Sequence, residues 1–129
     1  MLFPELAELT DIALLLLRLL IGLLFAKSGW SHLQKPEERG ESIGFSPGFT
    51  RVLGFAEFAA GIGIAVGLLP QISAFVIMGV MFGAIYKKLF AWKTGFWGED
   101  NGGWFYDVLY LVCAFVIATT GGGSLVIWP

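Results

Sequence analysis

The sequence predicts an all-α integral membrane protein, a bundle of four transmembrane helices joined by short connections. Of its 129 residues, 57% are hydrophobic and only 14% are charged, and the mean hydropathy is +0.78. A soluble domain usually carries about a quarter charged residues. A chain of this length is also too short to bury so many apolar side chains in one soluble core. A lipid bilayer therefore accounts for the composition better than water does.

Four apolar stretches are long enough to be considered as spans, since a hydrocarbon core about 30 Å thick needs about 20 residues of helix. We expect a single transmembrane domain over residues 1–129, with spans at about 11–33, 52–69, 71–92 and 104–120. Pro70 separates the second span from the third with no polar loop, which predicts two antiparallel neighbours. Residues 34–51 and 93–103 are rich in charged residues, Gly, Pro or Ser, and we expect both to be loops.

Basic residues predict the orientation of the chain in the cell (inner) membrane. All of them except Arg18 and Lys27 lie in or beside the two long connections, whereas the N-terminal segment, the Pro70 turn and the C-terminal tail carry none. The positive-inside rule then places both long loops in the cytoplasm and both termini outside. Three tryptophans that belong to an aromatic belt at the cytoplasmic interface agree with this orientation: Trp30, Trp92 and Trp104.

Several classes of function are disfavoured by the composition. Cys113 is the only cysteine and His32 the only histidine, so one chain cannot form a disulfide or a usual metal site of three or four such ligands. We expect no metal and no intrinsic cofactor. The net charge of −2, without a basic tract, predicts no nucleic-acid partner. The expected partners are the lipid bilayer and either other membrane subunits or further copies of this chain.

Ionisable residues within spans are costly, so each calls for a partner or a role. Helical spacing places Glu57, Lys87 and Asp107 at nearly the same depth on three different helices. Each lies on a stripe of small residues, and such stripes mark close helix contacts in lipid. We therefore expect all three in the interior, with Glu57 paired to Lys87. The cluster is either a functional site or an ion-pair network that only fixes helix register, and no catalytic residue is assigned.

The other polar residues near the spans have simpler interpretations. Lys88 faces away from the Lys87 stripe and, like Lys27, is expected to reach the headgroups. Arg18 belongs to the candidate buried polar site, where it either caps carbonyl groups at the outer end of another helix or binds an anionic group. His32 shares the inward stripe of Arg18 but lies at the cytoplasmic interface, where a hydrogen-bonded surface histidine is favoured over a cofactor ligand.

Three segments in register resemble the DoxX-like family of membrane proteins. Residues 17–33 resemble the family's opening, with an arginine, a glycine and a G-x-x-K-L-type end. Residues 55–69 resemble its E-x-x-x-G…G-L segment, and residues 118–124 its T-G-P-G-x-x-S terminus. The chain departs from this pattern at His32, where lysine is common, and at Gly122, where proline is common, and Asp107 lies near a usual polar position.

The resemblance implies a four-helix membrane bundle, described in the family as an oxidoreductase or as the membrane subunit of thiosulfate:quinone oxidoreductase-like systems. One hypothesis is thus a small accessory subunit of a membrane electron-transfer complex, with a quinone head group at the level of Glu57, Lys87 and Asp107. The alternative is a non-catalytic scaffold or assembly subunit with no redox chemistry of its own. An interior cavity that reaches Glu57 favours the first hypothesis, and a tightly filled interior favours the second.

Overall fold

A computed structural model describes residues 1–98 and 103–129, so part of the expected loop at 93–103 lies outside the described residues. Within the described parts the chain forms five α-helices, with no strand. Four of them are long: α1 (Thr10–Gln34), α3 (Pro47–Val66), α4 (Pro70–Tyr86) and α5 (Phe105–Thr120). A short 3-10 helix, η1 (Pro4–Leu9), precedes α1, and a π-helical turn, η2 (Lys87–Ala91), continues α4.

The one short α-helix in the described part of the chain is α2 (Pro36–Ile43), and it corrects the expectation that residues 34–51 are only a loop. Pro36 suits the first turn because its fixed φ is already helical and its missing N–H is not needed there. Gly44 ends the helix in the left-handed region at φ 78°. The next helix, α3, also begins earlier than expected, at Pro47, where the Ser46 hydroxyl accepts a hydrogen bond from the Phe49 N–H at 3.2 Å.

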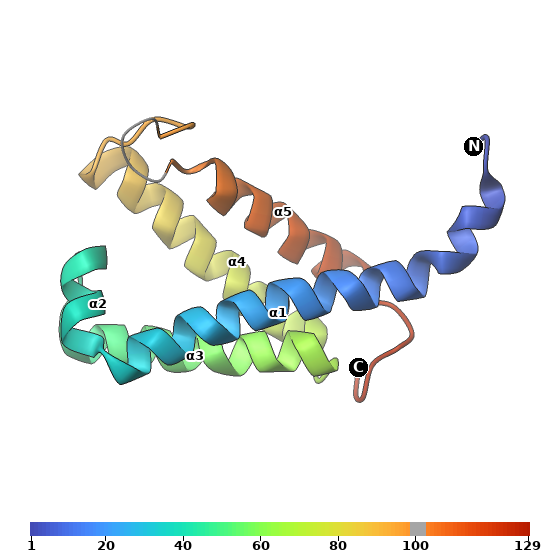
Figure 1. The fold of residues 1–129 in the computed structure, drawn as a ribbon, viewed down its shortest axis with the longest axis horizontal. Helices are drawn as coiled ribbons and strands as arrows, with labels where there is room; N and C mark the ends of the chain where they lie inside the picture. The colour runs from blue at the N-terminus through green and yellow to red at the C-terminus, as the bar shows by residue number, and fades with distance from the viewer. Residues whose placement is uncertain (99–102) are drawn as a thin grey trace.

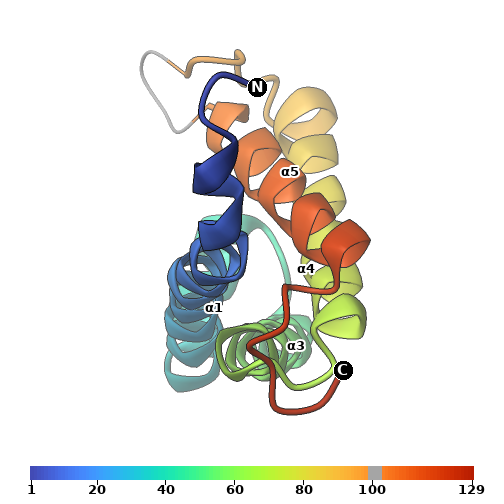
Figure 2. The same ribbon diagram turned by 90° about the vertical axis from the view of Figure 1, so that its right-hand side faces the viewer.

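The helices are arranged as two antiparallel pairs that form two arms. Figure 1 shows α1 lying along α3 and α4 lying along α5, and Figure 2 shows the same pairing from the side. The arms meet at the end where α3 turns into α4. We call it the tail end, because both termini of the chain lie on this side of the bundle. They separate toward the loop end, which carries α2 and the connection after η2.

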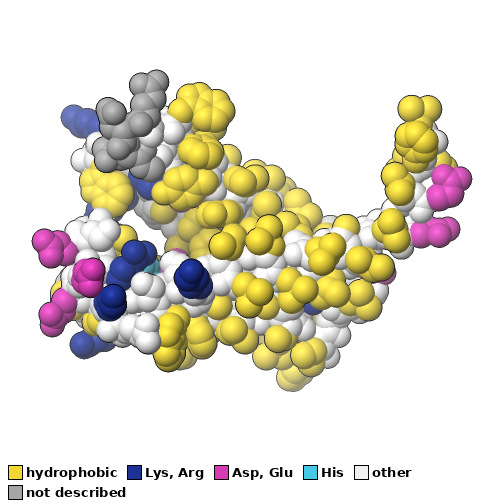
Figure 3. All heavy atoms as spheres, viewed as in Figure 1, with side chains coloured by type: hydrophobic (Ala, Val, Ile, Leu, Met, Phe, Trp, Pro, Cys, Tyr) yellow, Lys and Arg dark blue, Asp and Glu magenta, His cyan; other side chains and the backbone are white. Residues whose placement is uncertain are grey.

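Apolar side chains from both arms form the core where the arms meet. Ile64 of α3, Ile77 of α4 and Ile117 of α5 are fully buried together, and Phe25 of α1 packs into the same cluster. Many other large apolar side chains are exposed over the outside of the bundle, as Figure 3 shows for one face. A surface of this kind is stable against lipid tails, since these are as apolar as leucine.

In the described part of the chain, three helical stretches are long and apolar enough to cross a membrane: Pro4–Gln34, Pro47–Val66 and Pro70–Ala91. The fourth apolar helix, α5, has 16 residues, which is about 24 Å at 1.5 Å per residue. It is therefore shorter than the about 20 residues that a full span needs. Its α4 partner reaches the full length only because η2 extends it. The expected α-helical membrane bundle is confirmed, with α5 as its shortest long member.

The C-terminal tail folds back over the tail end instead of leaving the bundle. The N–H groups of Ile127 and Trp128 donate to the Gly67 carbonyl oxygen, both at 3.1 Å, and the Leu69 N–H donates to the Trp128 carbonyl oxygen at 2.7 Å. The Ser124 N–H donates to an Asp11 carboxylate oxygen at 3.0 Å. The tail is thus attached to the α3–α4 turn and to the start of α1.

We predict that α2 lies in the cytoplasm and η1 outside. Both carry exposed glutamates, so Glu41→Cys and Glu5→Cys are matched sites for labelling in a Cys113→Ser background. An impermeant maleimide added to intact cells is expected to label position 5 and to label position 41 only after the cells are opened. Labelling of position 41 but not of position 5 in intact cells would reverse the orientation.

Candidate functional site

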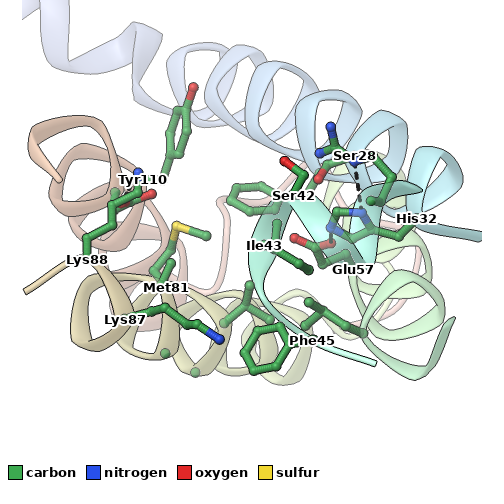
Figure 4. A pocket seen from close by; sticks show the side chains of 18 of the residues that line it. Ser28, His32, Ser42, Ile43, Phe45, Glu57, Met81, Lys87, Lys88 and Tyr110 are labelled. Atoms are coloured by element: carbon green, nitrogen blue, oxygen red, sulfur yellow. Dashed lines mark hydrogen bonds and ion pairs between the residues drawn. The ribbon is translucent and has the colours of Figure 1, made fainter. Parts of the chain in front are cut away.

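A cavity of about 760 Å³ lies between the two arms at the loop end. Side chains from every long helix and from α2 line it, and Figure 4 shows many of them around the open space. His32 and Glu57 lie on the wall formed by α1 and α3, and Lys88 and Tyr110 lie on the opposite wall. The lining is mostly apolar, so these polar groups are the features that can orient a ligand.

The first wall carries a close contact between His32 and Glu57. The His32 Nε2 atom lies 3.1 Å from Glu57 Oε2, and both side chains are about 5% exposed. Glu57 faces α1 because Gly54 and Gly61, one turn to either side, bring the two backbones close together. On the other side of the imidazole, the Arg39 Nε–H of α2 donates to His32 Nδ1 at 3.3 Å.

The second wall carries an ion pair between Lys88 and Asp107. Lys88 Nζ lies 2.8 Å from Asp107 Oδ2. The same ammonium donates to the Tyr106 hydroxyl at 2.6 Å and to the Gly103 carbonyl oxygen at 3.2 Å. Three acceptors from one short segment therefore surround this charge, and the arrangement offsets the cost of removing it from water.

The predicted pair between Glu57 and Lys87 is wrong, because Lys88 is the lysine that is buried. The stripe of small residues on which Lys87 lies contains Gly79 and Gly83, but both are exposed and a methyl group added at either would meet no other atom within 4 Å. The face that α4 buries instead carries Ala74, Ile77 and Met81. Lys88 continues this stripe seven residues after Met81. That spacing is the feature of the sequence that identifies Lys88 as the buried lysine.

Lys87 lies at the mouth of the cavity, half-buried. Its ammonium donates to the Gly44 carbonyl oxygen at 2.8 Å and lies 3.8 Å from the centre of the Phe45 ring. It thus connects the end of α4 to the residue that caps α2. Lys27 is exposed, in agreement with its expected position at the outside of the bundle.

His32 differs from the surface histidine that was favoured, since it is only 4% exposed. Its position on the stripe of Gly22, Phe25 and Gly29, all buried, was the sequence signal for the interior. The sequence does not identify Arg39 as a site residue, because the expected loop at 34–51 gives its side chain no defined direction. Among the predicted interface residues, Trp30 and Trp92 are about half exposed and Trp104 is partly buried, and Trp92 also lines the cavity.

Arg18 lies at the tail end, away from the residues that line the cavity. It is 1% exposed and donates to carbonyl oxygens of Ile64 at 3.1 Å, Gly122 at 3.0 Å and Leu125 at 2.7 Å. The first of these belongs to the last turn of α3, so Arg18 caps carbonyl groups, which was one of its two predicted roles. Its other two acceptors show that it also holds the C-terminal tail.

The carboxylates of both walls keep hydrogen-bonding capacity. Glu57 Oε2 and Asp107 Oδ2 are buried, and among the described residues neither accepts a hydrogen bond beyond its contact with His32 or Lys88. Each can therefore accept a hydrogen bond or a proton from a group inside the cavity. No group of three or more His, Cys, Asp or Glu side chains among the described residues is placed to hold a metal ion.

Comparison with known proteins gives one match. The DoxX family model matches residues 13–92, which is more than half of the chain. The chain belongs to the DoxX family. No curated protein and no solved structure matches it. The DoxX match runs from α1 to the residue after η2, so it includes His32, Glu57 and Lys88 but neither Asp107 nor the C-terminal tail.

The corrected lysine assignment predicts a clear difference between two neighbouring variants of this DoxX protein. Lys88→Met leaves Asp107 buried without its cation, and we expect it to lower the free energy of unfolding by about 3–5 kcal/mol. Lys87→Met removes only partly exposed contacts, those with the Gly44 carbonyl oxygen and the Phe45 ring, and is expected to cost about 1 kcal/mol or less. Unfolding in mixed detergent micelles measures both, and Lys88→Met with Asp107→Leu should recover most of the loss. Equal losses in the two single variants would contradict the assignment.

Proposed function

We propose that this DoxX protein is a small accessory subunit of a membrane electron-transfer complex, and that its cavity binds the head group of a quinone. The observation that carries the proposal is a cavity that reaches both Glu57 and the Lys88–Asp107 pair. A volume of about 760 Å³ lies within the range of about 300–1,000 Å³ that is typical of small-molecule sites. A purely structural subunit has no use for such a space in its interior.

The shape and lining of the cavity suit a flat ring. Gly79 and Gly83 leave the backbone of α4 bare along one wall, so a planar group can approach it closely. Phe25 and Tyr110 form an edge-to-face pair with ring centres 5.5 Å apart, and both line the cavity. Such aromatic side chains pack favourably against another ring. The apolar lining fits the rest of a quinone head group.

Polar side chains are available for the two oxygen atoms of the ring. Quinone oxygens accept hydrogen bonds, and the donors that line the cavity include the Tyr106 hydroxyl and the Ser28 hydroxyl. When bound, a quinone would supply the electron-carrying chemistry. The Glu57 and Asp107 carboxylates lie where they can hold or accept the protons that accompany it. The second redox group of such a system would belong to a partner subunit.

Opposite charges balance on both walls, which also favours a neutral ligand. Glu57 on the first wall is balanced by Arg39, which contacts the intervening His32, and Asp107 on the second wall is balanced by Lys88, so neither wall alone attracts an anion or a cation strongly. A neutral, mostly apolar molecule that enters from the bilayer avoids the desolvation cost of a charged one. This argument supports a quinone over a charged metabolite.

Filling the cavity without disturbing the fold tests the proposal. We predict that Gly83→Leu weakens quinone binding by about tenfold or more. A leucine there occupies space that the ring needs, which costs about 1–3 kcal/mol of binding free energy. Gly48→Leu is the matched control, since a Cβ atom added at either position meets no other atom within 4 Å but Gly48 does not line the cavity. Decylubiquinone and menadione are the probes, and quenching of tryptophan fluorescence in nanodiscs measures binding.

The expected result is saturable binding to the parent chain and to Gly48→Leu, with weak binding to Gly83→Leu. Circular dichroism and unfolding in detergent confirm that both variants are folded. If the parent chain shows no saturable binding, or if both variants bind equally well, the cavity is not a quinone site.

A further inference from the structure

His32 is the only histidine of the chain, and both of its ring nitrogen atoms are engaged by charged neighbours. Arg39 Nε approaches Nδ1 at 3.3 Å, and Glu57 Oε2 approaches Nε2 at 3.1 Å. A guanidinium group can only donate, so Nδ1 must act as the acceptor. The single proton of a neutral imidazole is then on Nε2, which faces the carboxylate.

The three residues lead from the loop end into the cavity. Arg39 lies on α2 and is half-buried, and the neighbouring α2 residues Glu37, Glu38 and Glu41 are exposed. His32 and Glu57 are each 4% exposed, and all three residues line the wall of the cavity. The imidazole is therefore the link between the exposed short helix and the buried carboxylate.

We propose that His32 is the route by which protons pass between the loop end and Glu57, and that Arg39 closes this route by occupying Nδ1. When Arg39 withdraws, Nδ1 can take a proton from water while the proton on Nε2 passes to Glu57 Oε2. One proton enters and one leaves, and the ring is left as the other neutral tautomer. Release of the Nδ1 proton as Nε2 is protonated again restores the first form.

While Arg39 is in place, the route is closed because the guanidinium occupies the Nδ1 lone pair. Other charged groups of the same cavity are Lys87 and Lys88 at the end of α4 and Asp107 of α5, of which Lys88 and Asp107 neutralise each other. Arg39 is thus the charged group that contacts His32 from the exposed side.

The short helix α2 is held in a way that lets this contact be made and broken. Lys87 donates to the carbonyl oxygen of Gly44, the residue that caps α2, and the Phe45 N–H donates to the Gly40 carbonyl oxygen at 2.8 Å. Its remaining side chains are mostly exposed, so few contacts oppose a small displacement. Arg39 is therefore a positioning residue that acts on Glu57 through His32.

Nuclear magnetic resonance of the full chain with ¹⁵N-labelled histidine tests the proposal, since one residue gives the whole signal. The parent chain in nanodiscs, without quinone, is expected to show the Nε2–H tautomer with slow exchange of this proton with water. Arg39→Met should give a mixture of tautomers and several-fold faster exchange. Arg51→Met is the matched control, because Arg51 is exposed and does not line the cavity.

Arg39→Lys should restore slow exchange, since an ammonium can also donate to Nδ1. A parent chain with the Nδ1–H tautomer would overturn the proposal. Equal exchange rates in Arg39→Met and Arg51→Met would overturn it as well. The proposal concerns proton access to the cavity of the proposed function, but this measurement uses no quinone. Failure of quinone binding and failure of the proton route are therefore distinguishable.

Discussion

Gly22 and Gly29 of α1 lie against Gly61 and Gly54 of α3, and the rest of the site depends on this contact. A methyl group added at Gly22 would lie 2.5 Å from the Gly61 carbonyl oxygen, and one added at Gly54 would lie 2.8 Å from the Gly29 carbonyl oxygen. Helices in lipid gain no hydrophobic driving force from each other, so close packing of this kind is what holds them together. The two backbones form one arm, with no space left between them for larger side chains.

This contact determines where the charges are found. His32 follows Gly29 by one turn on α1, and Glu57 lies between Gly54 and Gly61 on α3, so the glycines place the pair in contact at the loop end. The second arm neutralises its own charges with Lys88 and Asp107. Because each arm is internally paired, the arms have no need to close on each other there. A cavity remains between them, while Arg18 and the C-terminal tail hold the tail end together.

Much of this arrangement could be predicted from the sequence, and the errors have specific causes. The inward stripe of α1 from Arg18 to His32 and the glycine stripe of α3 are where periodicity placed them. Helical periodicity gave the wrong inward face for α4. A stripe of small residues does not always mark a contact between helices, and here Gly79 and Gly83 line the cavity. The partner of Glu57 could not be chosen from depth alone, because depth does not separate Lys87 from His32. The contact between Arg39 and His32 could not be predicted, because it requires the helix α2. The eight residues of α2 carry too weak a pattern to predict a helix.

The central claim is that glycine contact between α1 and α3 builds the arm that carries the site, and two alanine substitutions test it most directly. Gly61→Ala places a methyl group against the α1 backbone and should lower the free energy of unfolding by about 1–3 kcal/mol. The methyl group of Gly79→Ala meets no other atom within 4 Å. Alanine loses less conformational entropy than glycine when the helix forms, so this change should instead raise the free energy of unfolding by about 0.5–1 kcal/mol. Unfolding in mixed detergent micelles measures both. Opposite signs support the account, and stabilisation by Gly61→Ala would contradict it.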